Sequence, residues 1–205
     1  LNKQHYKVAG NHDLGNRILY EERYGKTYYS FLYENDVFIV LDSRIDSGNI
    51  SGKQLNLLKS TLSGLKSNQK LFIFFHDNLW WESTNKFKDV DINWVHSLNY
   101  SHLNFWKEIE PLLHKQQNNI YCFSGDLGGN KNKEAYMHYK EKNLVFAATG
   151  MGGGEKDNFL KVDVYENNNV EISVVFLKNL QQISITDYKL PYKMFGLSAL
   201  KIGGS

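Results

Sequence analysis

Short apolar runs alternate with helical stretches in the first half of the chain. Two runs rich in β-forming residues, 37–41 and 71–75, are continuous rather than alternating, as is typical of strands covered on both faces. Residues 120–123 form a third run of this kind. Between the first two runs, leucines recur at helical spacing over 51–65, with Ser51 as the expected N-cap. This alternation predicts an α/β first half.

A second helical segment is predicted just before the third apolar run. Over residues 102–115, Trp106, Ile109 and Leu113 share one helical face. Pro111 lies inside this segment, where it lacks an amide hydrogen for the helical ladder. We therefore expect the helix to be kinked or split there.

After Gly129 the pattern changes to short strands separated by turn residues. Strands are predicted at 143–149, 159–165, 170–177 and 183–187, with turns at residues 152–154 and 167–169. An α/β first half followed by a β-rich second half predicts an α+β sandwich. In it, two mixed β-sheets pack face to face with flanking helices. We interpret residues 1–188 as one domain and 189–205 as a C-terminal tail.

Composition narrows the class of protein. The chain has 205 residues, of which 41% are hydrophobic, so it can bury the core of one large domain. The net charge is only +2 and the charged residues are intermixed, which leaves no electrostatic footprint for nucleic acid. No apolar run approaches the roughly 20 residues of a membrane span. The single cysteine, Cys122, excludes an intrachain disulfide and is expected to be a buried, inert thiol.

The first stretch with chemical potential is Gly10-Asn11-His12-Asp13, which follows the short apolar step at residues 8–9. We interpret that step as the end of a strand, after which glycine allows a sharp turn. Open α/β sheets bind their ligands at such strand ends. The Asn11 amide oxygen can bind a metal, and His12 can protonate a leaving oxygen near neutral pH. Taken alone, the tetrapeptide is more typical of an ordinary turn.

Two more polar residues follow predicted strands. His76 comes directly after the run 71–75, and Asp126 follows the run 120–123 within Ser124-Gly125-Asp126-Leu127-Gly128-Gly129. Each has a plain alternative, a satisfied core histidine or a common Gly-Asp turn. Together with Asn11 they offer an amide oxygen, an imidazole and a carboxylate, a mixed set suited to Zn, Mn or Fe. Neighbouring strands lie side by side, so these residues can converge.

In this order the motifs resemble those of calcineurin-like metallophosphoesterases, which include the purple acid phosphatases. That family carries Asp-x-His, Gly-Asp, Gly-Asn-His-Asp/Glu, an isolated strand-end His and Gly-His-x-His. Residues 10–13 match the third block, His76 matches the fourth, and residues 124–128 lie where the fifth is expected. The flanks Tyr28-Tyr29-Ser30-Phe31, Leu41-Asp42-Ser43 and Gly52-Lys53-Gln54-Leu55 also resemble purple acid phosphatases. The resemblance covers about residues 5–165.

The resemblance implies a metal-dependent phosphoesterase acting on a small-molecule phosphate mono- or diester. Asn11 and His76 would bind the second ion of a dinuclear Fe, Mn or Zn pair, and Asp126 would join them. His12 would be the general acid or would position phosphate, with Asp13 orienting it. In the family's mechanism, a metal-bridging hydroxide attacks phosphorus in line. The resemblance to purple acid phosphatases also favours a secreted, vesicular or periplasmic setting.

The chain departs from the family pattern at two places. The Asp-x-His and Gly-Asp blocks are not found before Gly10, so we expect an upstream N-terminal segment of the same domain to supply them. In the fifth block, Asp126 replaces the first His and Gly128 the second. Aspartate still coordinates such cations, whereas glycine cannot, and His138 is a candidate to compensate. A permuted Gly-Asp block at residues 125–126 is disfavoured by the order of the motifs.

These departures leave an alternative function, a catalytically degenerate phosphoesterase fold that acts as a binding or interaction module. A carbohydrate-binding β-domain with an incidental Gly-Asn-His-Asp is a third, which does not explain the ordered motifs. The glycine-rich loop 150–154 lacks the Lys-Ser/Thr of a Walker loop, and the resemblance implies that it shapes the substrate rim. The aromatic residues between 80 and 106 are expected mainly to pack, with an aromatic wall for the substrate as the alternative: Trp80, Trp81, Trp94, Tyr100 and Trp106.

Overall fold

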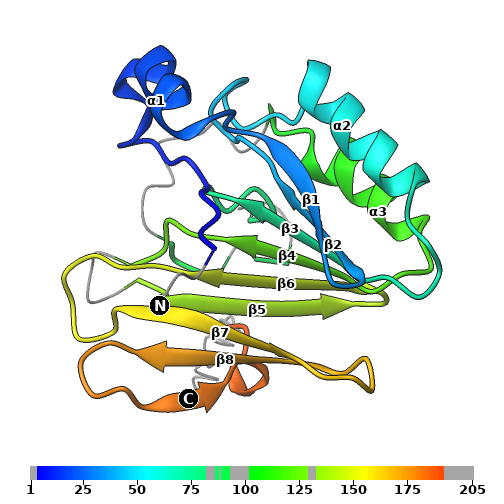
Figure 1. Cartoon of the computed structure of the whole chain (residues 1–205). Coiled ribbons are helices and arrows are strands. Elements are labelled where there is room, and N and C mark those ends of the chain that lie inside the picture. Colours follow the sequence, from blue (N-terminus) through cyan, green and yellow to red (C-terminus); the bar gives the residue numbers. More distant parts are fainter. Residues whose placement is uncertain (1–3, 82–85, 88, 93–101, 129–132, 192–205) are drawn as a thin grey trace, which may run out of the picture.

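The computed structural model describes residues 4–81, 86–87, 89–92, 102–128 and 133–191. Six strands form the main sheet: β1 Tyr29–Tyr33, β2 Asp36–Val40, β3 Leu71–Phe75, β4 Ile120–Ser124, β5 Tyr136–Glu141 and β6 Leu144–Thr149. Their order in the sheet is β1-β2-β3-β4-β6-β5 (Figure 1). Strands β2, β3, β4 and β6 are parallel, whereas β1 and β5 join the two edges antiparallel. The carboxyl ends of the four central strands therefore meet at one edge of the sheet.

Helices cover one face of this sheet (Figure 1). They are α2 (Gly52–Ser63) and the consecutive pair η3 (Phe105–Ile109) and α3 (Glu110–His114). The leucines at helical spacing on α2 point inward, because apolar side chains on one helical face are buried together. The core between the two layers includes Leu58, Leu62, Leu71, Ile73, Phe75, Phe105, Ile109, Leu113, Ile120, Cys122, Leu144 and Phe146.

Pro111 divides the second helical segment. Residues Phe105–Ile109 wind as a π-helix, and the amide of Glu110 donates to the carbonyl of Phe105. Pro111 then lies in the first turn of α3, where a missing amide hydrogen leaves no helical bond unmade. The predicted splitting of this helix is confirmed.

The second sheet packs on the other face of the main sheet (Figure 1). It contains β7 (Asn158–Val164), β8 (Val170–Phe176) and β9 (Gln182–Ser184), paired antiparallel in that order. A second core fills the space between the sheets, and it includes Phe72, Tyr121, Phe123, Ala147, Ile172, Val174 and Ile185. Several of its rings stack across neighbouring strands, with Phe72 and Tyr121 centroids 5.0 Å apart. This aromatic layer joins the two sheets into a sandwich.

The described residues also include three short helical segments. They are η1 (Leu14–Asn16), α1 (Arg17–Tyr24) and η4 (Ile185–Asp187). The side chain of Asn16 caps α1 by accepting a hydrogen bond from the amide of Leu19 at 3.1 Å. No helix in the described ranges has the length and apolar character to cross a membrane.

The predicted fold class is confirmed, with two sheets packed face to face and helices outside. Only the main sheet is mixed, since the described strands of the second are all antiparallel. Continuous apolar runs predicted the central strands well, and 71–75 coincides with β3. The pattern did not predict β1, β5 and α1. Of the predicted tail, residues 192–205 lie outside the described residues.

Two local predictions were wrong. Residues 8–9 are not in a strand, because two apolar residues alone do not specify a ladder, and Asn11 lies in a turn. Residues 185–187 form the short helix η4 instead of continuing β9. Ser51 is the N-cap residue of α2, as predicted, although its hydroxyl donates to the Asp46 carboxylate at 2.7 Å and makes no capping hydrogen bond.

Candidate metal centre

Polar residues gather where the parallel strands end. Residues 42–44 follow β2, His76 follows β3 directly, and Asp126 lies two residues beyond β4. The register brings these ends level, since Val40 pairs with Phe74 and Phe75 pairs with Ser124. The carboxyl edge of such a sheet is the usual place for a ligand site in α/β folds.

The three predicted metal ligands lie together at this edge. His76 Nε2 lies 2.9 Å from Asn11 Oδ1 and 3.8 Å from Asp126 Oδ1. Ligand atoms about 2.1 Å from a tetrahedral ion are roughly 3.4 Å from one another. The two separations that involve His76 bracket that value, so both are compatible with a shared divalent ion. A bound ion would take the lone pair of Nε2, which must then carry no proton.

Glycines bring the segments close to His76. A Cβ atom added to Gly10 would lie 2.8 Å from the imidazole Cε1 and Nδ1 atoms. On the other side, the Gly125 amide donates to the His76 carbonyl at 2.8 Å. Asp126 then adopts φ of 60°, a left-handed conformation that Asp tolerates better than most residues. This bend carries its carboxylate back towards His76.

His12 and Asp13 lie on the exposed side of the same turn. The Asp13 carboxylate accepts a hydrogen bond from the Gly10 amide at 2.8 Å, and the Asp13 amide donates to the Gly10 carbonyl at 3.2 Å. Asp13 therefore closes the turn that presents Asn11 and His12. That it orients His12 stays a prediction.

Sequence reasoning missed a charged pair that borders the centre. Arg44 donates to the carboxylate of Asp77, whose side chain is fully buried, and Ser43 donates to the other oxygen of Asp77. The Arg44 guanidinium is also 4.0 Å from Asp126 Oδ2. Asp77 is close enough to His76 and Asp126 to be a metal ligand. Both of its carboxylate oxygens, however, already accept hydrogen bonds from Ser43 and Arg44. The only signal for this pair in the sequence was that Arg44 and Asp77 each lie a few residues after the end of a strand.

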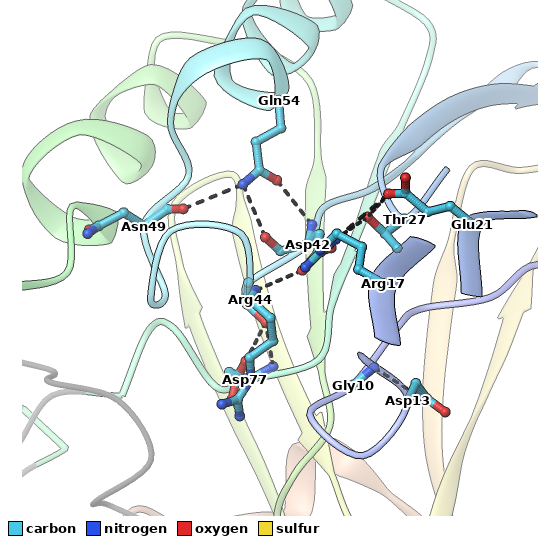
Figure 2. Close-up of polar contacts among 11 residues, drawn as sticks. Gly10, Asp13, Arg17, Glu21, Thr27, Asp42, Arg44, Asn49, Gln54 and Asp77 are labelled. Carbon is cyan, nitrogen blue, oxygen red and sulfur yellow. Dashed lines mark hydrogen bonds and ion pairs between the residues drawn. The ribbon is translucent and has the colours of Figure 1, made fainter. Parts of the chain in front are cut away.

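Side chains from two helices, α1 and α2, bind the segment that carries Arg44 (Figure 2). Gln54 of α2 accepts from the Asp42 amide and donates to the Asp42 carbonyl, both at 3.1 Å. Arg17 of α1 pairs with the buried Asp42 carboxylate, which also accepts from the Arg44 amide at 2.8 Å. The Leu-Asp-Ser stretch thus forms a fixed support under the centre.

Burial raises the pKa of the Asp126 carboxyl above its ordinary value, and the charge of Asp77 adds to this effect. Electrostatic interactions with His76, Arg44 and His12 oppose this rise in the pKa of Asp126. A carboxyl placed in this way gains from a nearby cation, because ionisation is otherwise costly in a partly buried site.

Other candidates lie elsewhere or have other partners. His138 is on β5, and no group of metal-binding side chains in the described residues includes it. Gly128 has a φ of 93°, a left-handed conformation that favours glycine. In the glycine-rich loop, the amides of Gly152, Gly153 and Gly154 all donate to the Asp157 carboxylate. These three amides of the loop 150–154 are therefore already satisfied by the Asp157 carboxylate.

The aromatic cluster is mostly core. Trp80 and Trp81 are buried in the core, and Trp106 packs against the same core and donates to the Trp80 carbonyl. The packing interpretation is confirmed for these three residues. Trp94 and Tyr100 lie outside the described residues.

A second group of potential metal ligands lies at the opposite edge of the sheet: Glu110, His114 and Glu141. Within it, His114 Nε2 is 2.8 Å from Glu110, and Glu141 is already bound by Lys86 at 2.7 Å. This group is a useful internal comparison for metal binding at His76.

No protein-family model and no curated protein matches the chain. Among solved structures it is similar to a purple acid phosphatase isolated from yellow lupin (Lupinus luteus) seeds, with a TM-score of 0.53 and 14% identity. The similarity covers 80% of this chain and 32% of the phosphatase. The fold is that of a calcineurin-like phosphoesterase. The chain spans about a third of the length of that phosphatase, and at this identity the similarity shows the fold alone.

Proposed function

We propose that the chain is a metal-dependent phosphoesterase that hydrolyses phosphate mono- or diesters of small molecules. One observation carries the proposal: Asn11, His76 and Asp126, from three separate segments, meet at the carboxyl edge of the parallel strands. The phosphoesterase fold supports it, because such a fold places its ligand site at this edge.

The roles follow from the donor set. Asn11, His76 and Asp126 would hold an Fe, Mn or Zn ion, which when bound supplies a Lewis acid and an acidified water. His12 is exposed on the adjoining turn and would donate a proton to the leaving oxygen of the ester. Asp13 holds the turn closed, which limits the positions that His12 can take.

The direct test combines metal content with turnover. The purified chain is loaded with Mn, Zn or Fe, its metal content and anomalous scattering are measured, and hydrolysis of p-nitrophenyl phosphate is followed. We expect metal-dependent turnover that His76→Ala abolishes together with metal binding. His114→Ala serves as the control, because it removes an imidazole from the second ligand group at the opposite edge.

Two results would contradict the proposal. In the first, the His114→Ala variant loses its bound metal whereas the His76→Ala variant keeps it. The other is folded, metal-loaded protein that turns over no phosphate ester.

The second candidate function is a catalytically degenerate fold that binds a phosphate group without hydrolysing it. The position of Gly128 favours it, since no side chain stands where the family's second histidine is expected. Binding of orthophosphate by metal-free protein, unchanged in His76→Ala and without turnover, would select this candidate.

A further inference from the structure

A pocket of about 310 Å³ lies between α1, β1 and the N-terminal segment that leads into the turn 10–13. Ligand sites of about 300–1,000 Å³ are usual in proteins, so this pocket suits a molecule with a single ring. Tyrosines and basic residues line it: His5, Tyr6, Lys7, Tyr20, Tyr24, Lys26 and Tyr29. None of these described lining residues is acidic, so the pocket presents aromatic surface together with positive charge.

The N-terminal segment forms one wall of the pocket and is fixed against β1. The Tyr29 hydroxyl donates to the Lys7 carbonyl and accepts from the Lys7 amide, both at 2.9 Å. Beside it, the Tyr6 ring stacks on Phe31 of β1, with ring centroids 3.6 Å apart and an interplanar angle of 6°. The sheet therefore holds this wall in place without help from a ligand.

Helix α1 forms the opposite wall. Tyr20 and Tyr24 are one helical turn apart, and their ring centroids lie 5.0 Å from each other. The Lys7 ammonium lies 3.7 Å from the centre of the Tyr24 ring, a cation–π contact that joins the two walls. Burial raises the pKa of the Tyr20 hydroxyl, and the charge of Asp13 adds to this effect. This phenol therefore keeps its proton near neutral pH and can donate to a ligand.

The lining side chains favour a ligand that is both flat and negatively charged. Tyrosine rings pack well against a planar ring, and ammonium groups bind an anionic oxygen. Phenol hydroxyls can donate to the same oxygen. A small aromatic ring that carries a carboxylate uses all of these groups at once, whereas an aliphatic anion would use the charges alone.

We infer that this pocket is a binding site for small aromatic acids. The ring of the ligand packs against the tyrosine side chains, and its acid group pairs with Lys7 and Lys26. The inference goes beyond the proposed phosphoesterase function, because this binding needs neither a metal ion nor hydrolysis.

The test uses the full chain in EDTA, which keeps metal binding out of the measurement. Ligand-observed NMR titration compares 4-hydroxybenzoate with 4-hydroxybenzamide, which lacks the charge, and with cyclohexanecarboxylate, which lacks the flat ring. We expect 4-hydroxybenzoate to bind the most tightly. Tyr24→Ala and Lys26→Met should each weaken its binding roughly two- to fivefold. Tyr165→Ala and Lys53→Met, which remove the same kinds of side chain at exposed positions elsewhere, are the matched controls.

Three results would overturn the inference. They are no binding of 4-hydroxybenzoate to the folded wild-type chain, equal affinity for the three compounds, and equal affinity in the pocket variants and their controls. Should Tyr24→Ala fail to fold, Lys26→Met and the comparison of the three compounds still decide. Metal-dependent turnover is measured separately, so this inference and the phosphoesterase proposal fail independently.

Discussion

Gly10 lies against the imidazole ring of His76, so close that a Cβ atom at Gly10 would be 2.8 Å from two ring atoms. The two residues are far apart in sequence, and the contact brings the turn carrying Asn11 onto the end of β3. The glycine is therefore needed for the approach of two segments as well as for the turn itself.

Gly10→Ala should loosen the metal centre with little effect on the fold. The added methyl group displaces the His76 ring, which separates Nε2 from Asn11 Oδ1. We expect metal affinity to fall by about 10–100-fold, as for other changes that misorient a ligand. Metal titration by calorimetry measures it. Gly15→Ala is the matched control, because nothing lies within 4 Å of a Cβ at that position. Equal affinities in the two variants would contradict the contact.

Asp77→Asn should destabilise the fold, because it leaves the charge of the partly buried Arg44 without its partner. Loss of one member of a buried pair costs about 3 kcal/mol in the free energy of unfolding. Asp163→Asn removes a carboxylate from the exposed Lys161 pair and should cost much less, because exposed ion pairs contribute little to stability. Urea denaturation of the three proteins at one pH compares them. Similar midpoints for both variants would show that Asp77 does not stabilise the chain.

His138 should make stability depend on pH. Burial on β5 lowers the pKa of its imidazole below the ordinary value, and Lys140 adds to the effect. In the unfolded chain the imidazole is protonated first as pH falls, so the unfolded state takes up more protons. Stability is therefore full above the unfolded pKa, near 6.5, and is lost as pH falls through the lower folded pKa.

His138→Gln should reduce this loss of stability, because glutamine does not titrate. Urea denaturation midpoints at a series of pH values from neutral downwards provide the measurement. His102→Gln, at an exposed position, is the control. A wild-type pH profile that His138→Gln leaves unchanged would refute the assignment.

The sequence predicted buried central strands more accurately than strands at the edge of the sheet. The run 71–75 is apolar on both faces because β3 lies in the middle of the sheet, and its bounds were predicted without error. The edge strands β1 and β5 have mixed patterns, since each has a neighbour on one side only, and neither was predicted. The short step at residues 8–9 was taken for a strand because two apolar residues resemble the end of one.

The sequence by itself determined the central strands, the fold class and the residue types of the candidate centre. These depend on local periodicity and on short motifs, which one stretch of chain carries alone. Only the tertiary structure decided that Asn11, His76 and Asp126 meet, and that Arg44 pairs with Asp77 across 33 positions. Such distances depend on strand order and register, which are set by how all the buried faces pack together.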